Sequence, residues 1–263
     1  MKIPFAQIDA FAGKAFEGNP AAVMPLDAWL DDDVLQRIAE ENNLSETAFL
    51  VATEGDADYE LRWFTPGTEV ALCGHATLAS GHYILSSQQD RDLVRFRTRK
   101  AGVLEVARHG HGYLMALPAY PPEAAEVPGL RAALGVTEGE TLRHPNGYDL
   151  TVLESSDAVL ALTPDFRALA ALGDTLNIVT APGADTDVVS RVFAPAAGID
   201  EDPVTGSAHA VLVPYWAARL GRNRFSAFQA SKRGGRVECE YAGDKVILGG
   251  KCVTVIEGSF TLA

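Results

Sequence analysis

The chain has 263 residues, of which 47% are hydrophobic and 22% are charged. Domains of roughly 100–200 residues are usual, so this length predicts one or two globular domains. The formal net charge of −13 would repel phosphate backbones, which excludes nucleic acid as an expected partner. No window approaches the roughly 20 apolar residues that cross a bilayer. The first residues meet acids and glycine too early for a signal peptide, so we expect a cytoplasmic protein that does not bind membranes.

Cysteines and short motifs argue against disulfides, metals and nucleotides. The three cysteines are an odd number without C-x-x-C spacing, which makes a disulfide framework or a cysteine zinc site improbable. The chain contains no P-loop sequence, no G-x-G-x-x-G after a predicted strand and no H-E-x-x-H. We therefore expect no cofactor and no metal.

The secondary structure is predicted to consist mainly of short strands. Gly18-Asn19-Pro20 indicates a turn, and Asp33 can cap a helix that ends near Asn42-Asn43. Residues 58–64 alternate in the manner of a half-buried strand, and Gly110-His111-Gly112 predicts a hairpin turn. Thr163-Pro164 supplies an N-cap and an N1 proline for a short helix that stops at Gly173. Further strands are expected at 49–52, 93–98, 176–180, 188–194, 236–241, 245–248 and 252–256.

An internal repeat relates the two halves of the chain. The sequence R-x-F-x-P occurs twice, 129 positions apart, and each copy leads through an acidic stretch to a glycine that opens an apolar segment. The matching parts are 62–66 with 191–195, Glu69 with Glu201, and Gly74 with Gly206. Because the order of strand, proline, acid, glycine and helix is the same in both halves, we expect two related lobes.

The two apolar segments that follow these glycines predict the architecture. Residues 75–87 and 207–220 are apolar around most of a helix, which is typical of a buried helix. We predict an α+β fold with two pseudo-symmetric lobes, each a mostly antiparallel sheet wrapped around one central buried helix. The lobes are predicted to span 1–117 and 118–252, and a last strand near 253–263 is expected to return to the first.

The candidate chemistry lies around these helix starts. Free backbone N–H groups at Gly74 and Gly206 form a potential anion site suited to a carboxylate, although simple N-capping would explain either one alone. His75 follows Gly74 and can titrate near neutrality. Cys73 is either a thiolate activated by the helix start or a small buried hydrophobe. The acidic run at 201–202 can cap the second helix, but that role does not need both acids.

The same residues fall within sequence blocks that resemble those of PhzF-like (phenazine-biosynthesis-protein-like) proteins. The blocks are Gly18–Val23, Asn43–Phe49, Arg62–Pro66, Cys73–Thr77 and Glu201–His209. They occur in the order found in the family, and together with Arg233-Gly234-Gly235 they extend over nearly the whole chain. The resemblance implies the diaminopimelate-epimerase-like fold, usually as a homodimer.

The resemblance also implies roles for individual residues. The named member of the family isomerises a dihydro-hydroxyanthranilate without a cofactor, and its catalytic glutamate corresponds to Glu46. His75 and Asp202 correspond to the other catalytic positions, and the substrate-binding positions are Cys73, Gly74, Gly206 and Ser207. Racemases and epimerases of this fold use two cysteines as opposed bases. Here the second such position carries Thr205, a hydroxyl for which the sequence indicates no activating base.

Three hypotheses follow. The first is a cofactor-independent isomerase that moves a proton within a small carboxylate-bearing metabolite, with Glu46 as general base and then acid. The second is a racemase or epimerase that uses Cys73 with another base. The third is a non-catalytic small-ligand-binding protein that has kept the fold and the anion site. The first hypothesis predicts that Glu46, His75, Asp202 and Ser207 line one cleft.

Overall fold

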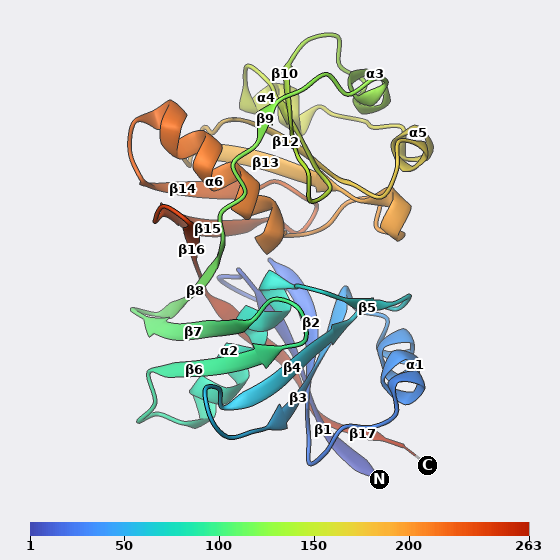
Figure 1. Cartoon of the computed structure of the whole chain (residues 1–263), viewed down its shortest axis with the longest axis vertical. Helices are drawn as coiled ribbons and strands as arrows, with labels where there is room; N and C mark the ends of the chain where they lie inside the picture. Colours follow the sequence, from blue (N-terminus) through green and yellow to red (C-terminus); the bar gives the residue numbers. More distant parts are fainter. Residues whose placement is uncertain (263) are drawn as a thin grey trace. The chain divides into compact units, whose positions relative to one another are not determined.

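The computed structural model describes residues 1–262, which form two compact units (Figure 1). The first unit comprises Met1–Ala116 and the segment from Gly249 onwards, and the second comprises Leu117–Leu248. That these units are separate domains with the sequence-based boundaries given above stays a prediction. Within residues 1–262, no helix is both long and apolar enough to cross a membrane.

The first unit consists of a curved set of strands and two helices. In chain order its elements are β1 (Lys2–Ala10), β2 (Asn19–Leu26), α1 (Asp32–Asn42), β3 (Glu46–Ala52), β4 (Tyr59–Phe64), β5 (Glu69–Val70), α2 (Gly74–Ser87), β6 (Leu93–Thr98), β7 (Val103–His109), β8 (Gly112–Pro118) and β17 (Cys252–Thr261).

The second unit has more short helices. Its elements are β9 (Glu123–Ala124), α3 (Leu130–Leu134), β10 (Glu140–His144), β11 (Tyr148–Val152), α4 (Ser156–Leu160), α5 (Phe166–Ala171), β12 (Leu176–Pro182), β13 (Val188–Phe193), η1 (Pro195–Ala197), α6 (Gly206–Leu220), β14 (Arg224–Gln229), β15 (Gly235–Tyr241) and β16 (Lys245–Gly250).

Strand pairing repeats the same pattern in the two units. In the first, β1–β2 is antiparallel, β2–β3 parallel, β3–β4 antiparallel, β4–β6 parallel and β6–β7 antiparallel. In the second, the pairs β10–β11, β11–β12, β12–β13, β13–β14 and β14–β15 follow the same alternation. Each parallel pair is joined by a connection that contains a helix, as parallel neighbours require. The internal repeat and the predicted fold are therefore confirmed.

Helix α2 is enclosed by the strands of the first unit. It contacts β1, β2, β3, β6, β7 and β17, and ten of its fourteen residues are buried. Gly81 lies where the helix passes closest to β7, since a Cβ atom there would be 2.3 Å from Val106 Cγ1. The sequence between Gly74 and Ser87 is apolar on most sides because strands surround it.

Helix α6 has the corresponding place in the second unit, and ten of its fifteen residues are buried. Trp216 Nε1 donates to Thr180 Oγ1 on β12 at 3.0 Å, so the largest side chain of the helix has its polar atom satisfied. Pro214 has no N–H to give to Ala210 O, and Tyr120 N donates to that carbonyl instead at 2.8 Å. The segment around Tyr120, near the start of the second unit, is thereby attached to the central helix of that unit.

One ion pair recurs in both units. Arg62 binds Glu69 with two hydrogen bonds of 2.8 Å, and Arg191 binds Glu201 with hydrogen bonds of 2.7 and 3.1 Å. Each guanidinium also lies over the phenylalanine two residues later, at 4.9 Å for Phe64 and 5.1 Å for Phe193. We call these pairs the Arg–Glu clamps. Each clamp fixes the acidic segment five residues before a central helix.

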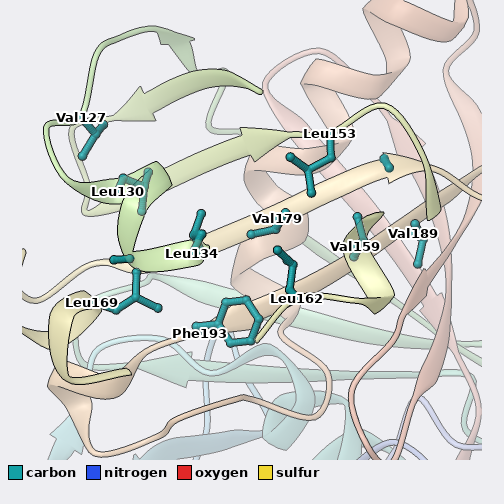
Figure 2. Close-up of a cluster of buried hydrophobic side chains, with 12 residues drawn as sticks. Val127, Leu130, Leu134, Leu153, Val159, Leu162, Leu169, Val179, Val189 and Phe193 are labelled. Atoms are coloured by element: carbon teal, nitrogen blue, oxygen red, sulfur yellow. The ribbon is translucent and has the colours of Figure 1, made fainter. Parts of the chain in front are cut away.

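Separate apolar clusters hold the outer helices on the strands. In the second unit α3, α4 and α5 pack on β12 and β13 through a cluster that includes Leu134, Val159, Leu169 and Phe193 (Figure 2). In the first unit Leu35 and Ile38 of α1 pack against Phe49 and Phe64. These clusters account for the apolar positions on the shorter helices.

The structure corrects three local predictions. Helix α1 begins after Asp31 and not at Asp33, and the side chain of its N-cap residue makes no capping bond. Asp165, not Thr163, caps α5, since its carboxylate accepts from Ala168 N at 2.9 Å. Asn19 and Pro20 lie in β2 and not in a turn. In each case the sequence indicated a capping or turn residue close to the end of the element. The observed end lies one or more residues away from that position.

The clamp of the second unit predicts a large effect on stability. Arg191→Met should lower the free energy of unfolding by about 2–4 kcal/mol, because it leaves the mostly buried Glu201 carboxylate without its partner. Arg224→Met is the matched control, since Arg224 pairs with Glu240 at the surface and is 80% exposed, and it should cost less than about 1 kcal/mol. Urea unfolding of both variants measures the difference. Equal costs would show that the clamp is not structurally important.

Candidate active site

Glu46 and His75 meet at the start of α2. Glu46 is the first residue of β3, and His75 is the second residue of the helix. Glu46 Oε2 lies 3.0 Å from His75 Nε2, and the two side chains are only 12% and 4% exposed. At this distance the two atoms form an ion pair, but they are not aligned for a hydrogen bond. Neither atom has a hydrogen-bond partner among residues 1–262. A carboxylate and an imidazole are thus held together out of water.

The other ring nitrogen of His75 faces two further residues. Asn19 Nδ2 lies 3.2 Å from His75 Nδ1, and Cys73 Sγ lies 3.5 Å from the same atom. Asn19 begins β2, the strand beside Glu46, and Cys73 is the N-cap residue of α2. The imidazole is therefore fixed from both sides.

Burial and neighbouring charge set the protonation of this group. Burial raises the pKa of the Cys73 thiol to about 11, and the Glu46 carboxylate adds to the rise. Cys73 is therefore a neutral thiol near pH 7, which favours the buried-hydrophobe interpretation of this residue over the thiolate. Burial opposes the charged form of His75, but the Cys73 sulfur and the Glu46 carboxylate raise the pKa of His75 well above its ordinary value. With the thiol neutral, Glu46 is the remaining neighbouring charge that acts to raise the pKa of His75.

These residues are also the one group within the described chain that offers three potential metal ligands. The ligand atoms of Glu46, Cys73 and His75 lie within 4.8 Å of one another. Cys73 approaches Nδ1 of the imidazole, however, whereas Glu46 approaches Nε2. One metal ion could not bind all three side chains in this arrangement unless the ring turned.

A second polar group precedes α6 in the other unit. The Thr205 hydroxyl donates to Asp202 Oδ2, and Gln229 Oε1 accepts from Thr205 N at 2.8 Å. The Thr205 hydroxyl therefore has a carboxylate neighbour, which the sequence did not indicate. A carboxylate is nevertheless far too weak a base to convert an alcohol into an alkoxide, so Thr205 does not take the place of a thiolate.

Both central helices begin without a side-chain cap. Cys73 and Thr205 occupy the N-cap positions, and neither side chain accepts a hydrogen bond from its helix. The outer helices differ, since Ser155 caps α4 and Asp165 caps α5. Uncapped N–H groups with the positive end of the helix dipole suit a carboxylate or another anion.

The structure groups the predicted residues in two sets. Glu46, Cys73, Gly74 and His75 lie together in the first unit, and Asp202, Gly206 and Ser207 lie at the start of α6 in the second. That both sets line one cleft stays a prediction.

Glu201 has a different place from its neighbour Asp202. It belongs to the clamp with Arg191, which explains why the run contains two acids. Glu201 therefore stabilises the fold, whereas Asp202 remains a candidate site residue.

Three polar residues near these sets were missed from the sequence. Asn19 belongs to the sequence G-N-P, which is typical of a turn. Gln229 lies in a strand whose sequence has no distinguishing feature. Tyr148 on β11 is buried, which raises its pKa, and a hydrogen bond with the Ser207 side chain opposes that rise. Tyr148 also packs beside Tyr120, with ring centroids 5.7 Å apart. No local pattern distinguishes these residues, because only the fold brings them to the helix starts.

Comparison with known proteins identifies the family. The family model described as phenazine biosynthesis-like protein matches residues 8–258. The chain belongs to this phenazine biosynthesis-like family. An uncharacterized isomerase of Pseudomonas aeruginosa is 50% identical over the full length of both chains. A crystal structure of a PhzF-family protein from Enterococcus faecalis has 44% identity and a TM-score of 0.92, again over the full length of both chains.

A more distant structure shows how widely the fold is used. A hydroxyproline epimerase from Agrobacterium vitis aligns over 98% of this chain and 92% of its own, with a TM-score of 0.65 and 13% identity. This likeness shows the fold alone. Phenazine biosynthesis-like proteins therefore share their architecture with a hydroxyproline epimerase.

His209 gives a prediction about the pH dependence of stability. Its Nδ1 donates to Thr205 O at 2.8 Å, and burial lowers the pKa of His209 to about 4. An unfolded histidine has a pKa of about 6.5, so the unfolded chain binds more protons between these values and stability falls as the pH falls. From pH 7.5 to pH 5 this one group should cost the native state about 2 kcal/mol.

His209→Gln isolates that contribution from the other titrating groups. Urea unfolding at the two pH values should give the variant a loss about 2 kcal/mol smaller than that of the wild type. The same loss in both proteins would mean that His209 does not titrate in this way.

Proposed function

We propose that this protein is an isomerase that moves a proton within a small carboxylate-bearing metabolite, with Glu46 as general base and then acid. The contact of Glu46 with His75 carries the proposal, because it places a carboxylate beside a buried imidazole at the start of an uncapped helix. The relative from Pseudomonas aeruginosa is named an isomerase, which agrees with this reaction class.

The proposed step leaves its charges balanced within the site. Glu46 accepts a proton from a substrate carbon and becomes neutral, while the bonding electrons remain on the substrate as an enolate-like anion. The proton on His75 keeps a positive charge beside that anion, where a fixed charge out of water is most effective. Glu46 then returns the proton to a second carbon, which completes the isomerisation without a redox partner.

We further propose that the substrate carboxylate binds at the helix starts. The N–H groups that follow Cys73 and Thr205 are not capped by those side chains. Asp202 and Ser207 would orient the polar substituents of the substrate. A homodimer, the absence of a cofactor and a cytoplasmic location are expected from the sequence and stay predictions.

Replacement of the proposed base should stop the reaction. Glu46→Gln should lower turnover by about 10²–10⁴-fold, because the amide keeps the shape of the side chain but cannot accept and return a proton. Affinity for the substrate and thermal stability should change little. The measurement is turnover with a carboxylate that takes up label from deuterated buffer, together with a binding titration.

Glu41→Gln is the matched control, since Glu41 is an exposed glutamate five residues away. It should keep wild-type turnover. If Glu46→Gln retained more than about a tenth of the activity, the loss would be too small for a general base, and Glu46 would not be the base.

A Cys73-dependent racemase is the second candidate, supported by the position of Cys73 directly before α2. Its neutral thiol argues against this mechanism. We expect Cys73→Ser to lower turnover by less than about tenfold, since a hydroxyl can keep the packing and polarity of the site but cannot serve as a base. Loss of all turnover in this variant, with Glu46→Gln still active, would favour the racemase.

The third candidate is a binding protein without activity. Two candidate carboxylates can be incubated in deuterated buffer. One is a dihydro-hydroxyanthranilate, which the resemblance to PhzF-like proteins implies, and the other is trans-4-hydroxyproline, which is bound in the structure of the hydroxyproline epimerase. An isomerase or epimerase introduces deuterium at carbon, whereas a binding protein leaves the compounds unlabelled.

A further inference from the structure

Gln229 makes an unusual number of contacts with the loop that leads into α6. Its side chain is fully buried at the end of β14. Oε1 accepts from Thr205 N at 2.8 Å, and Nε2 donates to Asp202 O at 2.8 Å and to Thr205 Oγ1 at 3.1 Å. All three of these hydrogen bonds are thus directed at two residues of the loop before α6, Asp202 and Thr205.

These contacts fix the orientation of the amide. Thr205 N can only donate and Asp202 O can only accept, so Oε1 and Nε2 cannot exchange places. Because Nε2 donates to Thr205 Oγ1, the hydroxyl hydrogen is left to point at Asp202 Oδ2, where the Thr205–Asp202 hydrogen bond is found. Gln229 thereby sets the direction of the hydroxyl that holds the Asp202 carboxylate.

The same loop is anchored at three other points. Asp202 N donates to Val192 O at 3.0 Å, and Ser231 Oγ donates to Pro203 O at 2.8 Å. His209 Nδ1 donates to Thr205 O at 2.8 Å. These bonds hold the backbone of the loop, but Gln229 is the residue whose side chain also orders the Thr205 hydroxyl.

The internal repeat provides a control for this observation. The Arg–Glu clamp occurs in both units and therefore serves the shared fold. The position that corresponds to Asp202 in the first unit is Val70, and the strand register places Thr98 where Gln229 lies. The Thr98 hydroxyl donates to Gly102 O in its own turn and does not reach the helix start. The fold can therefore be built without this network, and its presence in the second unit needs another reason.

We propose that Gln229 is a positioning residue, which holds the Asp202 carboxylate and the start of α6 in the arrangement that the substrate requires. The inference rests on the proposed function, in which Asp202 orients the substrate. Gln229 does not touch the reacting atoms and acts through Asp202 and Thr205.

A double-mutant cycle tests the inference. Gln229→Met keeps the length of the side chain but removes the acceptor and both donors, and should lower kcat/KM by roughly 10- to 100-fold. If Gln229 acts through Asp202, the same change in an Asp202→Asn background should cost less than about threefold, because contacting residues are not additive. Equal losses in both backgrounds would overturn the inference. The assay uses whichever of the two candidate carboxylates takes up deuterium in the wild type.

Hydrogen exchange at the Thr205 amide tests the contact without any substrate. The amide should exchange at least about tenfold faster in Gln229→Met than in the wild type, and should stay protected in Gln229→Glu, which keeps an acceptor. If the methionine variant folds poorly, Gln229→Leu removes the same hydrogen bonds and takes its place in this measurement. Unchanged exchange in Gln229→Met would overturn the inference.

Failure of the proposed function would look different. Glu46→Gln with wild-type turnover would remove the proposed base. A non-additive cycle between Gln229 and Asp202 in the same enzyme would still support the positioning role.

Discussion

Each unit closes its strands around one central helix, and the placement of its polar groups follows from this. A helix in this position must be apolar on nearly all sides, and only its ends can present polar groups to a ligand. In α2 and α6 the side chain at the N-cap position makes no capping hydrogen bond. His75 and Cys73 are buried beside such an end, with the largely buried Glu46 next to them, and burial raises the pKa of the Cys73 thiol.

The internal repeat separates what serves the fold from what serves the site. The strand alternation, the central helices and the Arg–Glu clamps occur in both units. The chemical groups do not. Glu46 and Tyr148 belong to the first residue pairs of equivalent parallel ladders, Ala21–Glu46 and Tyr148–Leu176, so Leu176 takes the place of Glu46 in the second unit. The repeat thus supplied two similar helix starts with different side chains around them, Glu46 and His75 at the first and Asp202 and Ser207 at the second.

Much of this organisation could be predicted from the sequence. Periodicity and the R-x-F-x-P repeat were sufficient for the two buried helices, because these features depend on residues close together in the chain. The sequence also placed Glu46 and His75 in a candidate site. The sequence could not distinguish Glu201 from Asp202, because the ion-pair partner of Glu201 is Arg191, ten residues earlier on β13. Asn19, Tyr148 and Gln229 were missed for the same physical reason, because each gains its role only when strands distant in sequence become neighbours of a helix start.

We propose that one residue, Glu46, both removes and returns the proton. It is tested most directly by following deuterium carried by the substrate carbon that loses its proton, during a single turnover in ordinary water. A single carboxylate shielded from solvent should deliver part of that deuterium to the accepting carbon of the same molecule, so labelled product is expected. Product that carries no deuterium at that carbon, formed at the full wild-type rate, would indicate separate bases for removal and return and would contradict the account.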